Sequence, residues 1–308
     1  MRLLVVTNPR ATATTSRERD VVLASLASVA EVEVAETAHR GHAAALACRA
    51  MRAEDVDAIV ALGGDGTVNE VVNGMLTDGV HAGVPSLGIV PTGSTNVFAR
   101  AVGLPNDTVE ATGVLLDALR EGRTREVSMG RADDRWFVFG ASVGLPASIV
   151  GGVEKQRAKG RRSTHVLYAR VGVRQFFGAD RRHPQLQVEL PDGTILDDIH
   201  LVIITNTDPW TYAGGRPLRP TPEADFEHGL SLYARRRMGT LGMLFTVARL
   251  SGDKPRIGRR GAYLVNDLES LVVRSTSAMP VEVDGDYLGE RLELTLSSAA
   301  RAIHVLSI

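Results

Sequence analysis

The stretch that decides the fold is Val60-Ala-Leu-Gly-Gly-Asp-Gly-Thr-Val-Asn-Glu70. An apolar run ends at Leu62, glycines occupy 63, 64 and 66, and a helical pattern begins at Thr67. Thr67 and Glu70 have the spacing of a capping box, which is typical of a helix start. We therefore expect a buried strand that passes through a glycine turn into a helix, where free backbone N–H groups and the helix dipole bind phosphate.

Asp65 lies in the middle of this predicted anion-binding turn. A carboxylate there would repel a phosphate group unless a metal ion lay between them. Mg²⁺ takes few protein carboxylates and binds phosphate oxygens as well. The stretch therefore predicts a site for a nucleotide with Mg²⁺.

Composition limits the class of protein. The chain has 308 residues, 44% of them hydrophobic, and a net charge of −1, so no overall field favours nucleic acid. The single cysteine, Cys48, excludes an internal disulfide and a multi-cysteine zinc site. We find no signal peptide and no apolar run of the roughly 18 residues that would span a bilayer. These features predict a cytoplasmic protein whose membrane contact, on the inner face, is peripheral, and they leave the oligomeric state, a homodimer included, open.

Apolar runs and helical patterns alternate in the first part of the chain. The expected strands are Leu3–Val6, Val32–Ala35, Ala58–Leu62 and Leu87–Val90. The expected helices are Arg17–Val29, His42–Arg52, Val68–Leu76 and Asn96–Val102. This alternation is typical of a parallel sheet with helices on its faces, in which ligands bind at the carboxyl ends of the strands.

The pattern changes near residue 126, after which strand-like runs recur between turn signals. The expected strands are Arg135–Val143, Gln185–Leu190, His200–Thr205, Leu230–Ala234, Ser270–Arg274, Val281–Val283 and Leu292–Leu296. Helices are expected near Ala147–Ala158, Thr164–Phe177 and Leu241–Leu250. We expect an α/β nucleotide-binding domain over 1–126, completed by 297–308, and a mostly antiparallel second domain over 127–296.

A second glycine turn, Pro91-Thr-Gly-Ser-Thr-Asn96, follows the fourth expected strand. Together with Asn8-Pro9, Gly63–Asn69, Tyr212–Gly215 and Val283–Asp286, it resembles the diacylglycerol kinase catalytic domain family, which includes sphingosine and ceramide kinases and bacterial lipid kinases. The Gly-Gly-Asp-Gly turn is similar, more distantly, to that of NAD kinases. The resemblance implies a Rossmann-like α/β domain and a β-sandwich domain, with ATP and a lipid substrate meeting between them.

The resemblance also assigns roles to individual residues. Matches to the family's ATP-binding positions are Asn8, Thr37, Gly63, Gly64, Gly66, Thr67, Asn69, Gly93 and Ser94. Thr37 has a second interpretation, as the N-cap of the helix that follows it. Asp65 matches the aspartate that holds the catalytic Mg²⁺.

Candidate catalytic carboxylates lie in Val281-Glu-Val-Asp-Gly-Asp-Tyr-Leu-Gly289. Asp-Gly between alternating residues predicts a tight hairpin, which can also present carboxylates to a site. Transfer of a phosphoryl group to an alcohol needs an acceptor for the hydroxyl proton. The family pattern is Asp-Gly-Glu, so Asp284 matches its aspartate and Asp286 replaces its glutamate. We expect Asp284 to be the base with Asp286 assisting, and the reverse assignment stays open.

Three carboxylates of the family pattern are replaced in this chain. Val97 stands in the second glycine turn, Pro146 in a Gly-x-Asp-Ala element, and His228 in an Asp-Asp-Gly-Leu element that holds a structural Mg²⁺ in some bacterial members. Imidazole is a poor ligand for Mg²⁺. The replacements leave open whether the structural metal persists and whether turnover is lowered.

A basic stretch, Lys155–Arg162, precedes an amphipathic pattern that ends in Phe176-Phe177. It could contact anionic headgroups, with Arg235–Arg237 added to the same face, or be a solvated loop. The leading hypothesis is an ATP- and Mg²⁺-dependent kinase of diacylglycerol or a related lipid. The alternatives are a kinase of a soluble acceptor, as in NAD kinases, and an inactive nucleotide- or lipid-binding regulator.

Overall fold

The computed structural model describes residues 1–9, 15–161, 164–253, 255 and 261–307. Arg162, in the basic stretch, lies outside the described residues. The chain forms two compact units: unit 1 comprises Met1–Met129 and Ala300–Ile308, and unit 2 comprises Gly130–Ala299.

Unit 1 is built on a parallel sheet. Its strands lie in the order β4 (Ser86–Pro91), β3 (Ala58–Gly63), β1 (Arg2–Thr7) and β2 (Glu31–Glu36), and the end of β16 (Asp286–Leu306) joins the sheet beside β4. All of these pairs are parallel, with Val5 opposite both Val34 and Val60. The four expected strands and the α/β class of this unit are confirmed.

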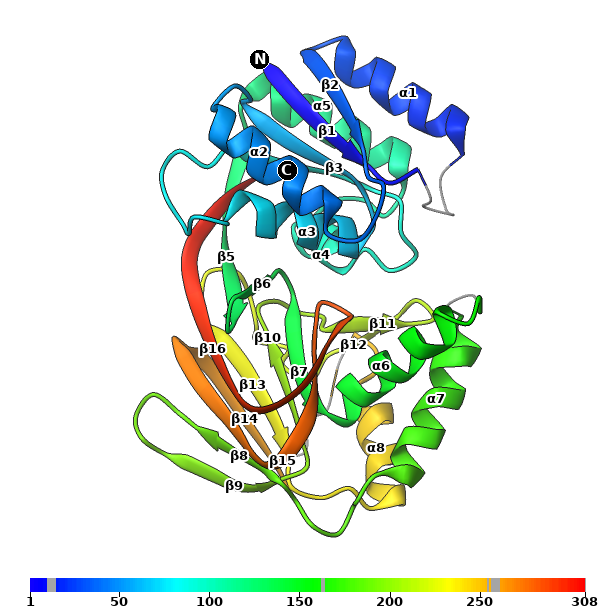
Figure 1. Ribbon diagram of the computed structural model, residues 1–308, viewed down its shortest axis with the longest axis vertical. Coiled ribbons are helices and arrows are strands. Elements are labelled where there is room, and N and C mark those ends of the chain that lie inside the picture. Colours follow the sequence, from blue (N-terminus) through cyan, green and yellow to red (C-terminus); the bar gives the residue numbers. More distant parts are fainter. Residues whose placement is uncertain (10–14, 162–163, 254, 256–260, 308) are drawn as a thin grey trace. The chain divides into compact units, whose positions relative to one another are not determined.

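Helices cover both faces of this sheet (Figure 1). α1 (Ser16–Ala27) and α5 (Thr108–Glu121) pack on one face, where Val22 and Leu26 of α1 share a core with Leu115 of α5. On the other face, α2 (His42–Ala53) packs against α3 (Asp65–Met75). Glycine at position 74 of α3 permits this close packing, because a Cβ there would lie 2.2 Å from the carbonyl oxygen of Ala44 in the alanine-rich α2.

Two details of unit 1 differ from the sequence reading. The expected capping box at Thr67 is wrong: α3 begins at Asp65, Gly64 is its N-cap, and no side chain caps it. The Glu70 carboxylate instead accepts the backbone N–H groups of Gly41 and Ala43 at the start of α2. The sequence reading also omitted α5, which Asp107 caps by accepting the N–H groups of Val109 and Glu110.

Unit 2 is antiparallel and rich in β-strands, as expected. Its main sheet has the order β14 (Ala262–Leu268), β13 (Leu230–Arg235), β10 (Leu201–Thr205), β7 (Gly140–Gly144), β15 (Ser270–Val283) and β16. β5 (Thr124–Ala132) pairs with β16 and with β6 (Arg135–Phe137), and β8 (Leu186–Glu189) pairs with β15 and with β9 (Ile195–Ile199). A short hairpin consists of β11 (Thr211–Ala213) and β12 (Arg216–Leu218). Side chains of β5–β10 and of β13–β16 form one apolar core.

The helices of unit 2 lie on one side of its strands (Figure 1). They are α6 (Leu145–Arg157), α7 (His165–Gly178) and α8 (Thr240–Leu250), close to the three expected ranges. α6 packs against β7 and β15, and against α7. The short helix α4 (Val97–Ala101) belongs to unit 1 and follows the second glycine turn.

Candidate active site

The two glycine turns of unit 1 touch each other. Gly64 follows β3 and Gly93 follows β4, and a Cβ built on Gly64 would lie 3.2 Å from the Cα of Gly93. The backbone N–H of Gly93 donates to the side chain of Asn96, whose amide group donates back to the carbonyl oxygen of Gly93. Asn96 takes a left-handed conformation, φ 47°, which asparagine tolerates. A Cβ at Gly93 would lie 2.6 Å from Oδ1 of Asn96, so this packing requires glycine at 93, and at Gly64 it leaves little room for a side chain.

Asp65 connects the two turns. Its Oδ1 accepts the backbone N–H of Phe98 at 3.3 Å, at the first turn of α4. Burial raises the pKa of Asp65 to about 6, while the backbone N–H groups of Val97, Phe98 and Asn96 act to lower it. The carboxyl group therefore lies at a helix N-terminus, where backbone N–H groups and the helix dipole stabilise negative charge.

The glycines of the first turn differ in how much space surrounds them. A Cβ at Gly63 would collide with the Thr67 side chain at 2.5 Å, whereas a Cβ at Gly66 would meet nothing within 4 Å. Gly66 is exposed in the first turn of α3. The protein's own packing therefore does not require glycine at 66, and open space at a helix N-terminus is where a phosphate can approach.

A small pocket of about 50 Å³ lies at the carboxyl ends of β1, β3 and β4. It is lined by Thr7, Asn8, Pro9, Thr15, Ser16, Arg19, Leu62 and Thr92. The buried Oγ1 of Thr92 and Nε of Arg19 have no hydrogen-bond partner within the described residues. Unsatisfied buried polar atoms are uncommon in folded proteins, and they indicate a place for a polar ligand. The sequence reading assigned Asn8 to this place and missed Thr92 and Arg19.

The other residues predicted to bind the nucleotide, Ser94, Thr37 and Asn69, lie in different environments. Ser94 is exposed in the second turn, and Thr37 follows β2 with its N–H bonded to the carbonyl oxygen of Thr7. The alternative interpretation of Thr37 as an N-cap is wrong, because α2 begins at His42 after Gly41. Asn69 is buried in α3, where its carbonyl and side-chain oxygens accept the amide group of Asn73.

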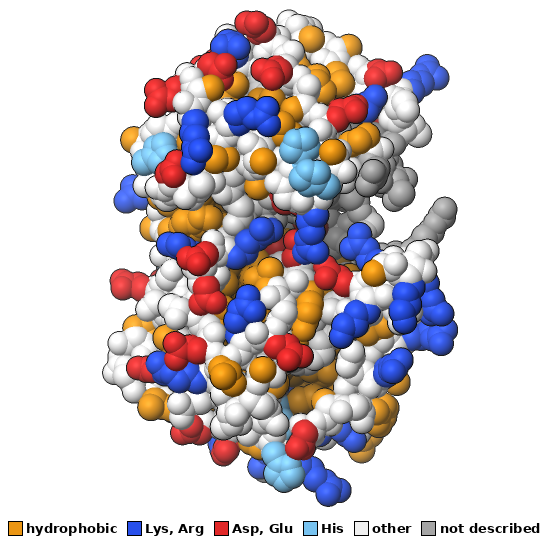
Figure 2. Space-filling model, in the orientation of Figure 1, with side chains coloured by type: hydrophobic (Ala, Val, Ile, Leu, Met, Phe, Trp, Pro, Cys, Tyr) orange, Lys and Arg blue, Asp and Glu red, His pale blue; other side chains and the backbone are white. Residues whose placement is uncertain are grey.

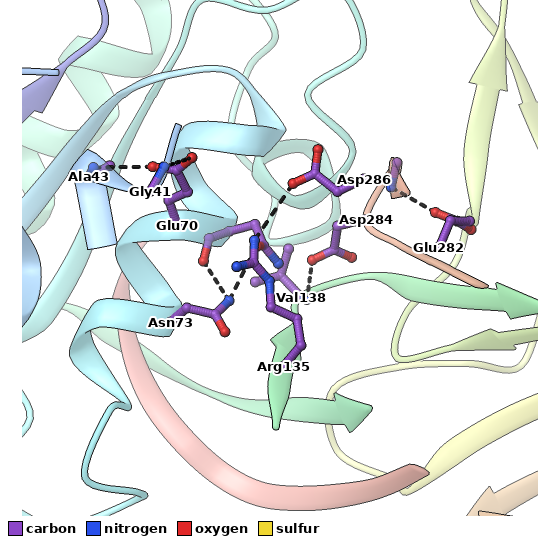
Figure 3. Close-up of polar contacts among 11 residues, drawn as sticks. Gly41, Ala43, Glu70, Asn73, Arg135, Val138, Glu282, Asp284 and Asp286 are labelled. Atoms are coloured by element: carbon purple, nitrogen blue, oxygen red, sulfur yellow. Dashed lines mark hydrogen bonds and ion pairs between the residues drawn. The ribbon is translucent and has the colours of Figure 1, made fainter. Parts of the chain in front are cut away.

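In unit 2, the expected hairpin at Asp284-Gly285 is confirmed. Val283 pairs with Asp286, and Asp284 and Gly285 both have positive φ angles, 49° and 81°, as a type I′ turn requires. The Asp284 carboxylate is buried and accepts three backbone N–H groups: that of Val138 at 2.7 Å (Figure 3), and those of Phe139 and Gly140 at 3.0 Å.

These three bonds explain a break in the sheet. The sequence reading expected one strand over Arg135–Val143, but β6 ends at Phe137 and β7 begins at Gly140. Between them, the N–H groups of Val138 and Phe139 bond to the Asp284 carboxylate instead of to a neighbouring strand. Asp284 therefore fixes the hairpin to unit 2's core, and most of its acceptor capacity is used.

Asp286 has a more open environment. It is partly exposed, and Oδ2 lies 3.6 Å from the Nη2 of Arg135 (Figure 3). This ion pair positions the carboxylate.

A third carboxylate, which the sequence reading did not select, lies in the same hairpin. Glu282 is buried, accepts the hydroxyl of Ser142 at 2.8 Å and accepts the N–H of Gly285 at 2.9 Å. Burial, together with the negative charges of Asp284 and Asp286, raises the pKa of Glu282 to about 7, against the hydrogen bonds from Ser142 and Gly285, which lower it. The sequence offered one signal for Glu282, which is its position in β15 between the apolar residues Val281 and Val283.

The metal-binding capacity of the described residues is limited. No group of three or more His, Cys, Asp or Glu side chains among them could hold a metal ion. His228 is exposed, and its Nδ1 lies 2.8 Å from Oδ1 of Asp225. Asp65 alone fits Mg²⁺ in the way that ion is commonly held, by one carboxylate with phosphate oxygens and waters.

Comparisons with known proteins agree with this architecture. The family model of the diacylglycerol kinase catalytic domain matches residues 2–132. A diacylglycerol kinase of Staphylococcus aureus (strain bovine RF122 / ET3-1) is 40% identical over 260 residues, 82% of this chain and 75% of that protein. A diacylglycerol kinase of Staphylococcus carnosus (strain TM300) is 27% identical over 253 residues, 77% of this chain and 72% of that protein.

Solved structures share the fold. A putative diacylglycerol kinase from Bacillus anthracis str. Sterne has a TM-score of 0.77 at 18% identity, covering 100% of this chain and 96% of that one. An NAD kinase from Archaeoglobus fulgidus, solved in complex with ATP, has a TM-score of 0.52 at 15% identity, covering 100% of this chain and 94% of that one.

The family model and these relatives define a kinase, a transferase of phosphoryl groups. The chain belongs to the diacylglycerol kinase family, and at the level of that family it is a lipid kinase. Within the described ranges, no helix combines the length and apolar character needed to cross a bilayer.

Proposed function

We propose that this protein transfers the γ-phosphoryl group of ATP to a hydroxyl of diacylglycerol or a related lipid, with Mg²⁺. The observation that carries the proposal is the contact of Gly64 with Gly93, which brings together two glycine turns and the Asp65 carboxylate at the ends of neighbouring parallel strands. Backbone N–H groups in such turns bind phosphate oxygens, and the transition state of phosphoryl transfer is stabilised mainly by positioning and charge.

In this proposal, unit 1 holds the nucleotide. The N–H groups of Gly64, Asp65, Gly66 and Ser94 bind phosphate oxygens, since those of Thr67 and Gly93 already donate to the Gly64 carbonyl oxygen and the Asn96 side chain. The pocket that includes Asn8 and Thr92 binds a polar part of the nucleotide. Asp65 binds Mg²⁺, which would neutralise phosphate charge. Thr37 lies close to this pocket, because its backbone N–H donates to the carbonyl oxygen of Thr7, which lines the pocket.

Unit 2 supplies the proton acceptor in this proposal. Asp286 is the better candidate for the base, because Asp284 already accepts three backbone N–H groups. The role of Asp284 is then to position the hairpin, and Arg135 orients the Asp286 carboxylate through their ion pair. The base assignment expected from the family pattern is thus reversed here on geometric grounds.

The test is a direct assay of phosphoryl transfer. Purified full-length protein is incubated with labelled ATP, Mg²⁺ and mixed micelles that contain diacylglycerol, sphingosine or phosphatidylglycerol, with an active lipid kinase as the positive control. Labelled lipid from one of these micelles is the expected result. Label found only in a soluble acceptor such as NAD, or no transfer at all, would contradict the proposal.

A further inference from the structure

Unit 2 contains a second pocket, which the proposed reaction does not use. It has a volume of about 650 Å³ and is lined by Arg181, Arg182, Pro184, Asp198, His200, Arg236, Arg237, Met238, Gly239 and Gly261. Its walls thus carry four guanidinium groups and one carboxylate, an excess of positive charge in a chain whose net charge is −1. Arginine clusters of this kind recognise phosphate, because the planar guanidinium can donate two parallel hydrogen bonds.

The four arginines form two pairs, one bonded to neighbouring side chains and one with its guanidinium donors available. Arg236 donates to Asp198 at 2.7 Å, and Arg181 donates to the Thr240 hydroxyl at 2.8 Å. The guanidinium groups of Arg182 and Arg237, by contrast, form no hydrogen bond or ion pair with another described residue, and both side chains are exposed. Arg181 and Arg236 are therefore held in place, whereas Arg182 and Arg237 can bind an anion.

His200 provides an independent sign of a ligand. It is only 8% exposed, it lines the pocket, and its imidazole has no hydrogen-bond partner within the described residues. Burial lowers the pKa of His200, so the ring is neutral near pH 7 and presents one N–H donor and one acceptor. The ring nitrogens reach the surface of the pocket, where a bound phosphate or its hydroxyl-bearing headgroup could supply a hydrogen-bond partner.

The start of α8 completes the pocket. Gly239, its N-cap, lines the pocket, and no side chain caps this helix of 11 residues. The unsatisfied N–H groups and the dipole of its first turn therefore favour an anion at the same place as the arginines.

α8 itself is apolar on two sides. Met243 and Leu250 pack into a cluster with Leu201, Ile203 and Tyr233. The opposite side exposes Leu241, Leu244, Phe245 and Val247, with exposed fractions of 72%, 64%, 65% and 52%. A helix that is apolar all round is typical of one that contacts lipid or another apolar surface.

This apolar side is continuous with the pocket. Arg181 bonds to Thr240 at the start of α8, and its guanidinium lies 4.7 Å from the ring centre of Phe176 and 5.3 Å from that of Phe177. Phe177 is 60% exposed, as is Val173 one turn earlier on α7. On the face drawn in Figure 2, Lys and Arg side chains gather over the part of unit 2 that carries α6 and α7. The exposed basic residues of α6, of α7 and of the segment between them include Lys155, Arg157, Lys159, Arg170 and Arg174.

We propose that the arginine pocket binds the phosphate headgroup of an anionic phospholipid while the exposed apolar side chains of α8 enter the bilayer. An anion in the pocket would then lie beside side chains that favour hydrocarbon, which is the arrangement of charge and apolar surface that a phospholipid presents. A free phosphate ion would use the arginines but would leave the apolar side of α8 exposed.

The experiment is vesicle flotation without nucleotide, so that its result does not depend on phosphoryl transfer. Full-length protein is mixed with vesicles of phosphatidylcholine alone or of phosphatidylglycerol in phosphatidylcholine. The test variants are Arg182→Gln/Arg237→Gln and Leu244→Ser/Phe245→Ser. The matched controls, which change exposed residues elsewhere, are Arg120→Gln/Arg291→Gln and Ile195→Ser/Leu292→Ser.

We expect wild type and both controls to float with the anionic vesicles. The arginine variant should lose binding about tenfold or more, since each arginine near a charged surface contributes about 1 kcal/mol. The Leu244→Ser/Phe245→Ser variant should lose it by a similar factor, since two apolar side chains no longer enter the bilayer. Thermal unfolding checks that the variants fold, and the single changes Arg182→Gln and Arg237→Gln replace the double variant if it does not. Wild-type flotation by the arginine variant, or equal binding to phosphatidylcholine alone, would overturn the proposal. So would arginine-dependent binding of inorganic phosphate without vesicle binding.

Discussion

The Asp65 Oδ1 accepts the Phe98 backbone N–H at 3.3 Å. The aspartate of the first glycine turn therefore also holds the N-terminus of α4, the helix that follows the second turn. Its charge has two possible partners, the helix end and a metal ion, and both favour a carboxylate over a neutral group.

Asp65→Asn should abolish transfer while leaving the protein folded. Asparagine can still accept the Phe98 N–H, so we expect the free energy of unfolding to fall by no more than about 1–2 kcal/mol. A neutral amide holds Mg²⁺ poorly, so turnover should be lost. Asp107→Asn is the matched control, because Asp107 also accepts N–H groups at a helix start in unit 1. Lipid phosphorylation and denaturant unfolding separate the two effects, and an active Asp65→Asn variant would exclude Asp65 as the metal ligand.

Gly93→Ala should weaken the fold of unit 1. A Cβ at residue 93 would lie 2.6 Å from Oδ1 of Asn96 and 3.0 Å from the Cα of Gly64, so the two turns would have to separate. We expect a loss of about 1–3 kcal/mol in the free energy of unfolding. Gly113→Ala is the control: it lies in α5 with open space around it and should stabilise the protein by about 0.5–1 kcal/mol. Equal unfolding midpoints for the two variants would show that the contact between the turns is not required.

Asp284→Asn and Asp286→Asn should fail in different ways. Asp284→Asn replaces one of the two acceptor oxygens with an NH₂ group, so at least one of three buried backbone N–H groups loses its acceptor and faces a donor, and we expect a loss of about 2–4 kcal/mol in stability. Asp286→Asn breaks a partly exposed ion pair, with a stability cost under about 1 kcal/mol, but it should lower kcat by about 100-fold or more. Stability and kcat are measured for both. Normal turnover in Asp286→Asn with loss in a stably folded Asp284→Asn would assign the base to Asp284.

Glu282 should make stability depend on pH. Its pKa is raised to about 7, so the folded state binds more protons than the unfolded state between the ordinary glutamate pKa and 7. The free energy of unfolding should therefore fall as pH rises through this range, by about 3 kcal/mol in total from this group. Glu282→Gln cannot ionise, so its melting temperature relative to wild type should rise from pH 5 to pH 8. Glu290→Gln, an exposed control in the neighbouring strand, should show no such change. A constant difference between Glu282→Gln and wild type would contradict the assignment.

The fold was predictable where the local pattern was strong. Buried strands such as Ala58–Leu62 carry uninterrupted apolar runs, and the Asp284-Gly285 hairpin carries the residues that its turn type requires. α5 could have been found from Asp107 and from Gly122, which ends it with a left-handed φ of 65°. The predicted start of α3 is three residues late, because Gly64 and Asp65 favour a turn when they are considered alone.

The site was predictable only in part, since it depends on residues that meet in space. No spacing in the sequence shows that Asp284 takes N–H groups from Val138 and Phe139, 145 or more residues away. The same holds for Glu282 with Ser142, and for Thr92, whose hydroxyl is recognised as unsatisfied only when its surroundings are known. The arginine pocket likewise combines Arg181 and Arg182 after α7 with Arg236 and Arg237 after β13.

The central claim is that the glycine turns of unit 1 bind the phosphates of ATP, and Gly66→Ala tests it most directly. The new Cβ would meet no protein atom within 4 Å, and alanine favours the helix, so this variant should be as stable as wild type or more stable by about 0.5–1 kcal/mol. In isothermal titration with Mg-ATP, wild type should bind at one site, and Gly66→Ala should bind about tenfold or more weakly, because its Cβ occupies the space that a phosphate needs. No heat of binding in wild type, or equal affinity in a folded Gly66→Ala variant, would contradict the account.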